Sequence, residues 1–105
     1  MTKTGSLPAP RGLSPSAVRI WRRVTGTYHF ENEPASQLLL ETALQAHDRM
    51  HQARDLIAVQ GLTIMNRYSN YVPNPLLAIE DKSRRAMLQA MQQLGLEPQK
   101  LEEKP

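Results

Sequence analysis

Residues 32–61 read NEPASQLLLETALQAHDRMHQARDLIAVQG, and this stretch decides the fold. Its apolar residues recur at intervals of three and four, the spacing that places side chains on one side of an α-helix. Asn32 is the expected N-cap, and Gly61 is the expected left-handed C-terminal cap. The predicted helix is roughly 42 Å long, more than a compact chain of this size needs, so we expect its stripe to pack within the chain and also between copies. The stripe consists of Leu39, Ala43, Ala46, Met50, Ala53 and Ile57.

The chain has 105 residues and no cysteine. This length predicts one domain that gains from association, because a small monomer buries only about two-thirds of its unfolded surface. The absence of cysteine excludes disulfides and thiolate metal sites. No apolar run approaches the roughly 20 residues of a membrane span, and the polar N-terminus lacks the apolar core of a signal peptide. We therefore expect a soluble intracellular protein without a membrane partner.

The net charge of +3 is unevenly distributed along the chain. Residues 1–31 carry five basic side chains and one acidic one, a net +4, whereas residues 32–61 carry two basic and four acidic ones, a net −2. A basic end is compatible with a polyanionic partner such as DNA, but a modest basic excess also serves solubility. The candidate DNA-binding residues are Lys3, Arg11, Arg19, Arg22 and Arg23.

The N-terminal third is expected to contain a flexible arm and one short helix. Residues 1–12 are rich in proline and glycine and poor in apolar side chains, which predicts an arm that cannot order itself. Ser14 followed by Pro15 predicts the start of a helix that reaches about residue 25. Its two faces differ, one apolar and one basic, and the basic face is either solvated surface or a phosphate-contacting row. The apolar face is Ala17, Ile20, Trp21 and Val24, and in the connector at 26–31 Tyr28 and Phe30 are expected to pack inward.

The C-terminal half predicts a hairpin and a second long helix. Residues 62–72 favour a small β-hairpin that turns at 67–70, and Pro73 and Pro75 should interrupt regular structure. Asn74 then caps a helix over 75–94, which Gly95 ends, with Leu96 closing the cap. Residues 13–96 thus form a mainly α domain with an antiparallel pair of long helices, and 97–105 form a flexible tail. The second stripe is Ile79, Ser83, Ala86, Met87, Ala90, Met91 and Leu94.

The best candidate for a chemical site is the segment from His47 to His51. It places two imidazoles at i and i+4, as in zinc proteases, but Asp48 replaces the longer glutamate that must reach metal-bound water. The remaining histidine, His29, lies in a connector. No glycine-rich phosphate loop, nucleophile elbow or paired carboxylates stand out. We expect no catalytic residues, no metal and no cofactor.

Several soft motifs, in order and at matching spacing, resemble a known family. They are Leu13-Ser14 leading to Trp21, residues 39–49 with the run Ala46-His47-Asp48-Arg49, Leu56-Ile57 leading to Gly61, Asn74-Pro75, and Leu94-Gly95-Leu96-Glu97-Pro98. Over residues 13–99 the chain resembles a phage terminase small subunit.

The resemblance implies a non-enzymatic component of the DNA-packaging motor. Such subunits form oligomeric rings, bind double-stranded viral DNA in the cytoplasm of the bacterial host, and present it to the terminase large subunit, which carries the ATPase and nuclease. One departure is that no clear helix-turn-helix is found, since a single short helix precedes the long one. Two alternatives remain: a helical adaptor that binds protein only, and a phage transcription regulator.

Overall fold

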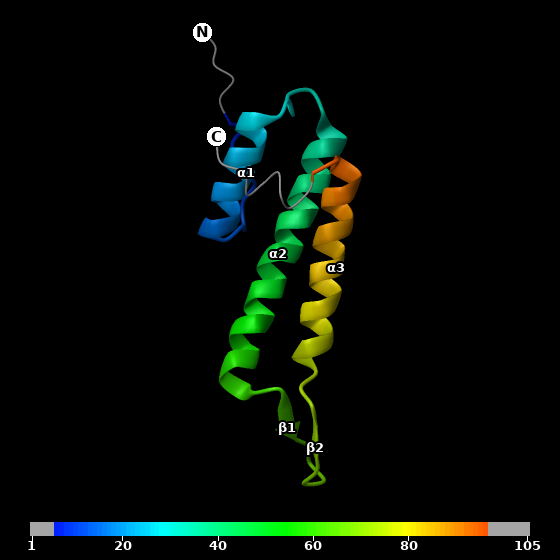
Figure 1. The fold of residues 1–105 in the computed structure, drawn as a ribbon. Helices are drawn as coiled ribbons and strands as arrows, with labels where there is room; N and C mark the ends of the chain where they lie inside the picture. Colours follow the sequence, from blue (N-terminus) through cyan, green and yellow to red (C-terminus); the bar gives the residue numbers. More distant parts are fainter. Residues whose placement is uncertain (1–5, 97–105) are drawn as a thin grey trace.

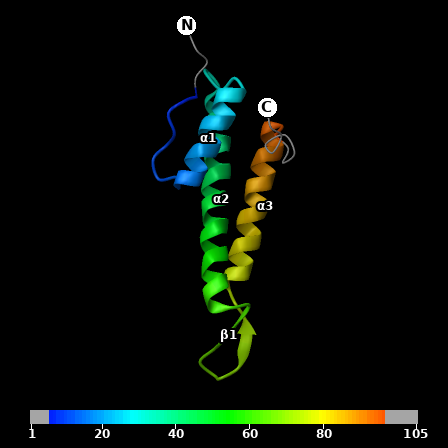
Figure 2. The same cartoon turned by 60° about the vertical axis from the view of Figure 1, so that its left-hand side comes forward.

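The computed structural model describes residues 6–96 and contains three helices and one hairpin. The chain runs up through α1, down through α2, around the hairpin at the far end and back up through α3 (Figure 1). The long helices lie antiparallel, as predicted, and α1 lies along only the half of α2 that is farther from the hairpin (Figures 1 and 2). The elements are α1 Pro15–Thr27, α2 Pro34–Gln60, β1 Thr63–Met65, β2 Tyr71–Pro73 and α3 Leu76–Leu94.

The start of α2 differs from the prediction. Asn32 does not cap the helix, because it lies in a turn with φ of 65°, and Glu33 occupies the cap position without a side-chain hydrogen bond. The Glu33 N–H donates to the Phe30 carbonyl at 3.1 Å, which closes this turn. Asparagine tolerates the left-handed region better than most residues, so it serves the turn here and not the cap. In the same connector Phe30 is buried as expected, whereas Tyr28 is exposed, contrary to the prediction.

Gly61 ends α2 by a different conformation from the expected one. Its φ of 96° is positive, but its ψ of 172° is extended and not left-handed helical. The Gly61 N–H still donates to the Ile57 carbonyl at 2.7 Å, and the extended ψ directs the chain into β1. The prediction that a glycine stops the helix here is confirmed, and the predicted type of cap is wrong.

The predicted stripe on α2 is largely buried within one chain. Four of its members are buried, while Leu39 and Ile57 are half-buried. The prediction left out Leu40 and Leu44, which are completely buried. A helix that packs against α1 as well as α3 needs a wider apolar surface than one seam, which explains why these two leucines are required. The buried members of the predicted stripe are Ala43, Ala46, Met50 and Ala53.

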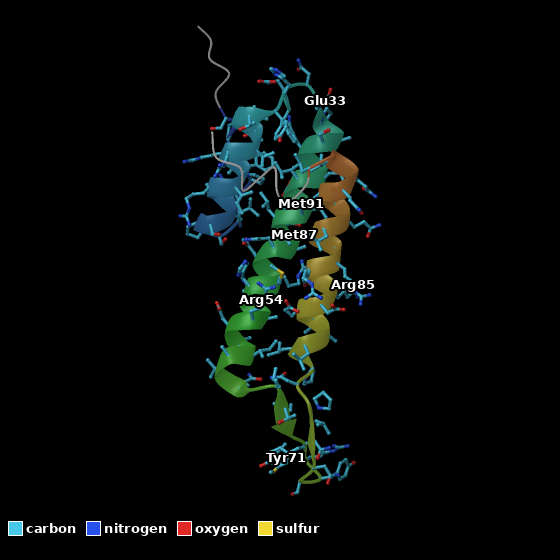
Figure 3. The ribbon with its side chains drawn as sticks, viewed as in Figure 1. Glu33, Arg54, Tyr71, Arg85, Met87 and Met91 are labelled. Atoms are coloured by element: carbon cyan, nitrogen blue, oxygen red, sulfur yellow. The ribbon has the colours of Figure 1, made fainter. Side chains whose placement is uncertain are left out.

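The core lies where all three helices meet, and the first half of α3 extends beyond it. Met91 and Ala90 of α3 belong to the core, and Met87 packs against it (Figure 3). Ile79 and Ala86 are exposed, so the predicted stripe on α3 is wrong at these two positions. The exposure of Ile79 follows from its place near the hairpin, where α1 does not reach and no third layer covers the helix pair.

Gly95 ends α3 as predicted. It adopts the left-handed conformation, with φ of 79° and ψ of 15°. Its N–H donates to the Gln92 carbonyl at 3.0 Å, and the Leu96 N–H donates to the Met91 carbonyl at 2.9 Å. These two bonds form a Schellman motif, and buried Leu96 supplies its hydrophobic contact.

The predicted hairpin is present, with three residues in each strand. Ile64 pairs with Val72 and Met65 with Tyr71, and Pro73 forms the last pair with Thr63. Pro73 therefore belongs to β2, contrary to the expectation that it would interrupt regular structure, because a proline is accepted at the end of an edge strand. The loop between the strands is fixed by Asn66, whose Oδ1 accepts the N–H groups of Tyr68 and Asn70 at 2.9 and 3.0 Å.

Buried Asn74 connects the ends of the two long helices. Its Nδ2 donates to the Gly61 carbonyl at 2.9 Å and to Gln60 Oε1 at 3.2 Å. Its Oδ1 accepts the Leu76 N–H at 3.0 Å, which is the predicted capping role. Pro75 already has helical dihedral angles (φ −58°, ψ −21°), although the hydrogen-bonded helix begins one residue later than predicted.

Part of the predicted N-terminal arm contacts the helices. Leu7 and Ala9 are partly buried against the core, so residues 6–12 do have apolar surface to bury. The backbone of Leu7 also forms hydrogen bonds with two side chains of α1. The remaining residues of the arm, 1–5, and the predicted tail at 97–105 lie outside the described residues.

Candidate nucleic-acid interface

The candidate interface is α1, whose N-terminus is fixed to the middle of α2 by a single carboxylate. Ser14 caps α1 as predicted, its Oγ accepting the Ala17 N–H at 3.1 Å. The Ser14 hydroxyl donates to Asp48 Oδ1 at 2.6 Å, and the Ser14 N–H donates to Asp48 Oδ2 at 2.8 Å. Both carboxylate oxygens of α2 residue Asp48 are thus used to hold the first turn of α1. A negative charge beside a helix N-terminus also interacts favourably with the helix dipole.

The environment of Asp48 keeps its carboxylate charged. Burial raises the pKa of this group, but hydrogen bonds from the Ser14 hydroxyl and N–H, and then from His47, outweigh burial, so the pKa of Asp48 lies below its usual value. His47 Nδ1 lies 3.1 Å from Asp48 Oδ1. A charged acceptor forms stronger hydrogen bonds than a neutral one, so the ionised state supports the attachment of α1.

The second half of α1 is held by residues 6–12. The Trp21 indole N–H donates to the Leu7 carbonyl at 3.0 Å, and the Leu7 N–H donates to Thr25 Oγ1 at 3.0 Å. The Thr25 hydroxyl donates in turn to the Trp21 carbonyl at 2.8 Å. Trp21 itself is 3% exposed, and Ala17 and Val24 are buried beside it, which confirms the predicted apolar face. The helix is therefore attached at both ends, with one orientation relative to α2.

The opposite face of α1 carries the predicted arginines. Arg19, Arg22 and Arg23 are all exposed, and positions 19, 22 and 23 fall within about 100° of the helix circumference. The helix contains no acidic residue, so its formal charge is +3. Arg11 is exposed in the turn that precedes α1, at the Ser14 end of the helix. Lys3 lies outside the described residues.

Three of the four arginines of the long helices form ion pairs. Glu80 and Asp81 of α3 are paired with three basic side chains, one from α2 and two from α3. Among residues 6–96, neither Arg19 nor Arg22 has a carboxylate within ion-pairing distance. By formal charge α1 carries +3, α2 carries −1 and α3 carries +1, so the net positive charge of the three helices is concentrated on α1. The three paired basic residues are Arg54, Arg84 and Arg85.

The histidine pair considered as a metal site has no third partner in the described part of the chain. The rings of His47 and His51 lie 4.4 Å apart, centroid to centroid. His47 Nδ1 is directed at the Asp48 carboxylate and is therefore not free to ligate. Over residues 6–96 no group of three or more histidine, cysteine or acidic side chains is placed to hold a metal ion.

Comparison with protein families identifies the chain. The sequence model of the family described as phage terminase, small subunit, matches residues 17–103, which is most of the 105 residues. The chain belongs to the phage terminase small subunit family. This confirms the resemblance found in the sequence and supports a role of this small subunit in phage DNA packaging. No curated protein and no solved structure matches the chain. Within residues 6–96, no helix of the terminase small subunit is both long and apolar enough to cross a bilayer.

Sequence reasoning misses the residue that positions the candidate interface. The sequence presents Asp48 only as a poor substitute in a metal motif, whereas it holds the N-terminus of α1. Its partner Ser14 lies 34 positions earlier, a separation that no local pattern detects. The one available signal is the run Ala46-His47-Asp48-Arg49 within the family resemblance. Of the predicted DNA-binding residues, the structure brings Arg19, Arg22 and Arg23 together on one face.

Proposed function

We propose that this terminase small subunit binds double-stranded DNA through the arginine face of α1, assembles as a homo-oligomeric ring, and delivers the DNA to the terminase large subunit. The observation that carries the proposal is the exposed row of Arg19, Arg22 and Arg23 on a helix held at both ends. In this proposal the chain has no ATPase or nuclease activity of its own, and the large subunit supplies both. Family membership supports the packaging role.

The attachment of α1 supports binding of a rigid duplex. Phosphate contacts are made by cations at fixed positions, and they supply most of the sequence-independent affinity for DNA. Because Asp48 and Leu7 fix α1, the side chains of Arg19 and Arg22 start from a defined backbone and lose less freedom on binding. In a ring the same contacts are repeated in each subunit, so a weak contact gives appreciable avidity.

The connection between α1 and α2 favours binding without sequence readout. A helix-turn-helix needs two short helices joined by a tight turn, with the second helix in the major groove. In the described residues α1 is followed by a six-residue connector and a helix of 27 residues, and the first half of this helix contributes Leu40, Ala43 and Leu44 to the core. We therefore propose electrostatic contact with the DNA backbone.

The test compares two double variants with equal changes of charge. Arg19→Gln with Arg22→Gln removes two positive charges from α1, and Lys82→Gln with Arg85→Gln removes two from exposed positions on α3. Binding of a labelled duplex is measured by fluorescence anisotropy from about 50 to 200 mM salt, with two unrelated sequences. The α1 variant should bind both duplexes more weakly, and its salt slope should fall by about one for each phosphate that it no longer neutralises.

The control variant on α3 should retain the affinity and the salt slope of the original chain. Equal effects of both variants would show that only overall charge matters. Unchanged binding by the α1 variant, with the oligomer intact, would refute the proposed interface and favour the adaptor that binds protein only.

A further inference from the structure

The two ends of α1 are attached to the rest of the chain by different contacts. At the first turn, both carboxylate oxygens of Asp48 accept hydrogen bonds from Ser14, at 2.6 Å from the hydroxyl and 2.8 Å from the N–H. This turn also contributes Ala17 to the core. In the second half of the helix, Trp21 is buried in the core and its indole N–H donates to the Leu7 carbonyl. Asp48 therefore supplies the polar attachment of the first turn to α2.

Two arginines lie beside the Asp48 attachment. Arg11 is three residues before Ser14, and Arg19 is five residues after it, roughly 7.5 Å along the helix axis. Both are exposed, and among residues 6–96 neither has a carboxylate within ion-pairing distance. Arg22, in contrast, follows Trp21 directly and lies roughly 12 Å from Ser14 along the axis. The position of Arg11 and Arg19 thus depends on the first attachment, and that of Arg22 on the second.

The first turn of α1 needs an external attachment to stay in place. Isolated helices shorter than about 12–15 residues are marginal in water, and α1 has 13 residues, so its order comes from contacts with the rest of the chain. The Ser14 hydroxyl oxygen accepts the Ala17 N–H at 3.1 Å while its hydrogen is donated to Asp48. The residue that caps the helix is therefore the same residue that connects the helix to α2.

We propose that Asp48 is a positioning residue of the DNA interface, which raises the affinity of the chain for DNA by holding Arg11 and Arg19 in place although it is itself negatively charged. The inference rests on the proposed DNA binding of α1 and adds Arg11 to the contact. A cation that is already held in position loses less freedom when it meets a phosphate. If the first turn is displaced, the apparent affinity falls with the fraction of chains in which it is still docked.

The carboxylate is placed where it repels DNA weakly. Its side chain is 13% exposed, and Ser14 occupies both of its oxygens. The positive end of the α1 dipole, which lies beside Asp48, offsets part of its charge. An exposed carboxylate within one Debye length of the phosphates, about 10 Å at 0.1 M salt, has no such compensation. The repulsion that Asp48 adds is therefore smaller than that of an exposed acidic residue.

The test compares two variants that each remove one negative charge from α2. Asp48→Asn removes the attachment, and Asp55→Asn removes an exposed charge. Duplex affinity of the full chain is measured by fluorescence anisotropy from about 50 to 200 mM salt. Loss of a repulsive charge alone should leave the affinity unchanged or raise it, as expected for Asp55→Asn. Asp48→Asn should instead bind about tenfold more weakly, the effect of one lost contact between charged groups, and its salt slope should fall by up to about two.

A double-mutant cycle identifies the arginines through which Asp48 acts. In a chain that already carries Arg11→Gln with Arg19→Gln, Asp48→Asn should cause no further loss of affinity, because the contacts that it positions are absent. In a chain that carries Arg22→Gln with Arg23→Gln, the same number of charges is removed, and Asp48→Asn should still weaken binding. A purely structural role of Asp48 would lower the affinity equally in both backgrounds.

Two substitutions of Ser14 test the attachment without changing any charge. Ser14→Ala removes the hydroxyl that donates to Asp48, whereas Ser14→Thr keeps a hydroxyl at this position. The alanine variant should lose affinity for DNA, and the threonine variant should retain most of it. Circular dichroism and Trp21 fluorescence establish that each variant is folded. If Asp48→Asn fails to fold, Ser14→Ala takes its place in the double-mutant cycle.

The outcomes separate this inference from the proposed function. Affinity of Asp48→Asn equal to or above that of the original chain, or an equal loss in the two arginine backgrounds, would overturn the inference. The same holds for unchanged affinity of Ser14→Ala where that variant replaces Asp48→Asn. The proposed function survives these results as long as Arg19→Gln with Arg22→Gln weakens binding. If this arginine variant binds as the original chain does, the proposed function and the inference both fail.

Discussion

Asp48→Asn tests whether one carboxylate holds α1 in place. The amide oxygen of asparagine can accept one of the two Ser14 hydrogen bonds, but the amide nitrogen faces the second donor and cannot accept. A hydrogen bond to a charged group contributes about 1.5–3 kcal/mol, and loss of the charge beside the helix N-terminus adds roughly 0.3–1 kcal/mol. The side chain is only 13% exposed, so solvent screening is small. We expect a loss of about 2–3 kcal/mol at pH 7.

The assay is urea and thermal unfolding at one fixed protein concentration, followed by Trp21 fluorescence. Trp21 is the single tryptophan of the chain and is buried in α1, so its emission reports directly on whether α1 is docked. A loss of this size lowers Tm by roughly 10–20 °C in a domain of about 100 residues. Asp55→Asn is the control, because it removes the same charge from an exposed position of α2 that forms no hydrogen bond or ion pair with the described residues.

The pH dependence gives a second readout. The pKa of Asp48 is lower in the folded chain than in the unfolded one, so its contribution to stability is present above the unfolded value and is lost as the pH falls through the folded value. Acidification from about pH 5 should therefore shrink the difference between the original chain and Asp48→Asn. If Asp48→Asn and Asp55→Asn differ by less than about 0.5 kcal/mol at pH 7, the carboxylate is not the anchor.

Two further outcomes follow from the backbone and from the histidine pair. Gly95→Ala should destabilise the chain by about 1 kcal/mol in urea unfolding, because φ is positive at this position. Gly26→Ala lies at a helical position where the added methyl group meets only ordinary contacts, so it should stabilise the chain by roughly 0.5–1 kcal/mol. Changes of stability with the same sign in both variants would contradict this reasoning. Zinc should not raise Tm, either in the original chain or after His47→Ala with His51→Ala, since no third ligand is placed near the pair in the described residues. A zinc-induced rise that the double variant abolishes would show that the histidines do bind metal.

The sequence predicts best those features that depend on near neighbours. Ser14 and Gly95 act on residues within five positions, so their capping roles follow from the local sequence alone. The exposed arginine row is likewise predictable, because a helix that buries Trp21 must present Arg19 and Arg22 elsewhere. The predictions of which side chains are buried on α2 are wrong where a second neighbouring helix packs against it.

The packing errors have a common physical origin. The predicted apolar stripe on α2 assumes that this helix packs against one other helix, but in the structure it packs against both α1 and α3. The prediction therefore misses the leucines at 40 and 44. The error at Asn32 is local, because a turn with positive φ takes the residue that was expected to cap the helix. The two hydrogen bonds that the backbone of Leu7 forms with the side chains of Trp21 and Thr25 can form only once α1 is in place, so the sequence around residue 7 does not predict them.

Asn74 makes the hairpin an exchangeable insert. Its side chain joins the carbonyl of Gly61, the residue that follows α2, to the first amide of α3 directly, so the two helix ends are held together independently of the strands. Its single bond toward the hairpin is donated by its backbone N–H to the carbonyl of Leu62, the residue that precedes β1. Residues 63–73 can therefore be shortened, lengthened or replaced while the helix pair keeps its alignment. A chain built in this way is free to change the shape of one end without redesigning the packing of the other.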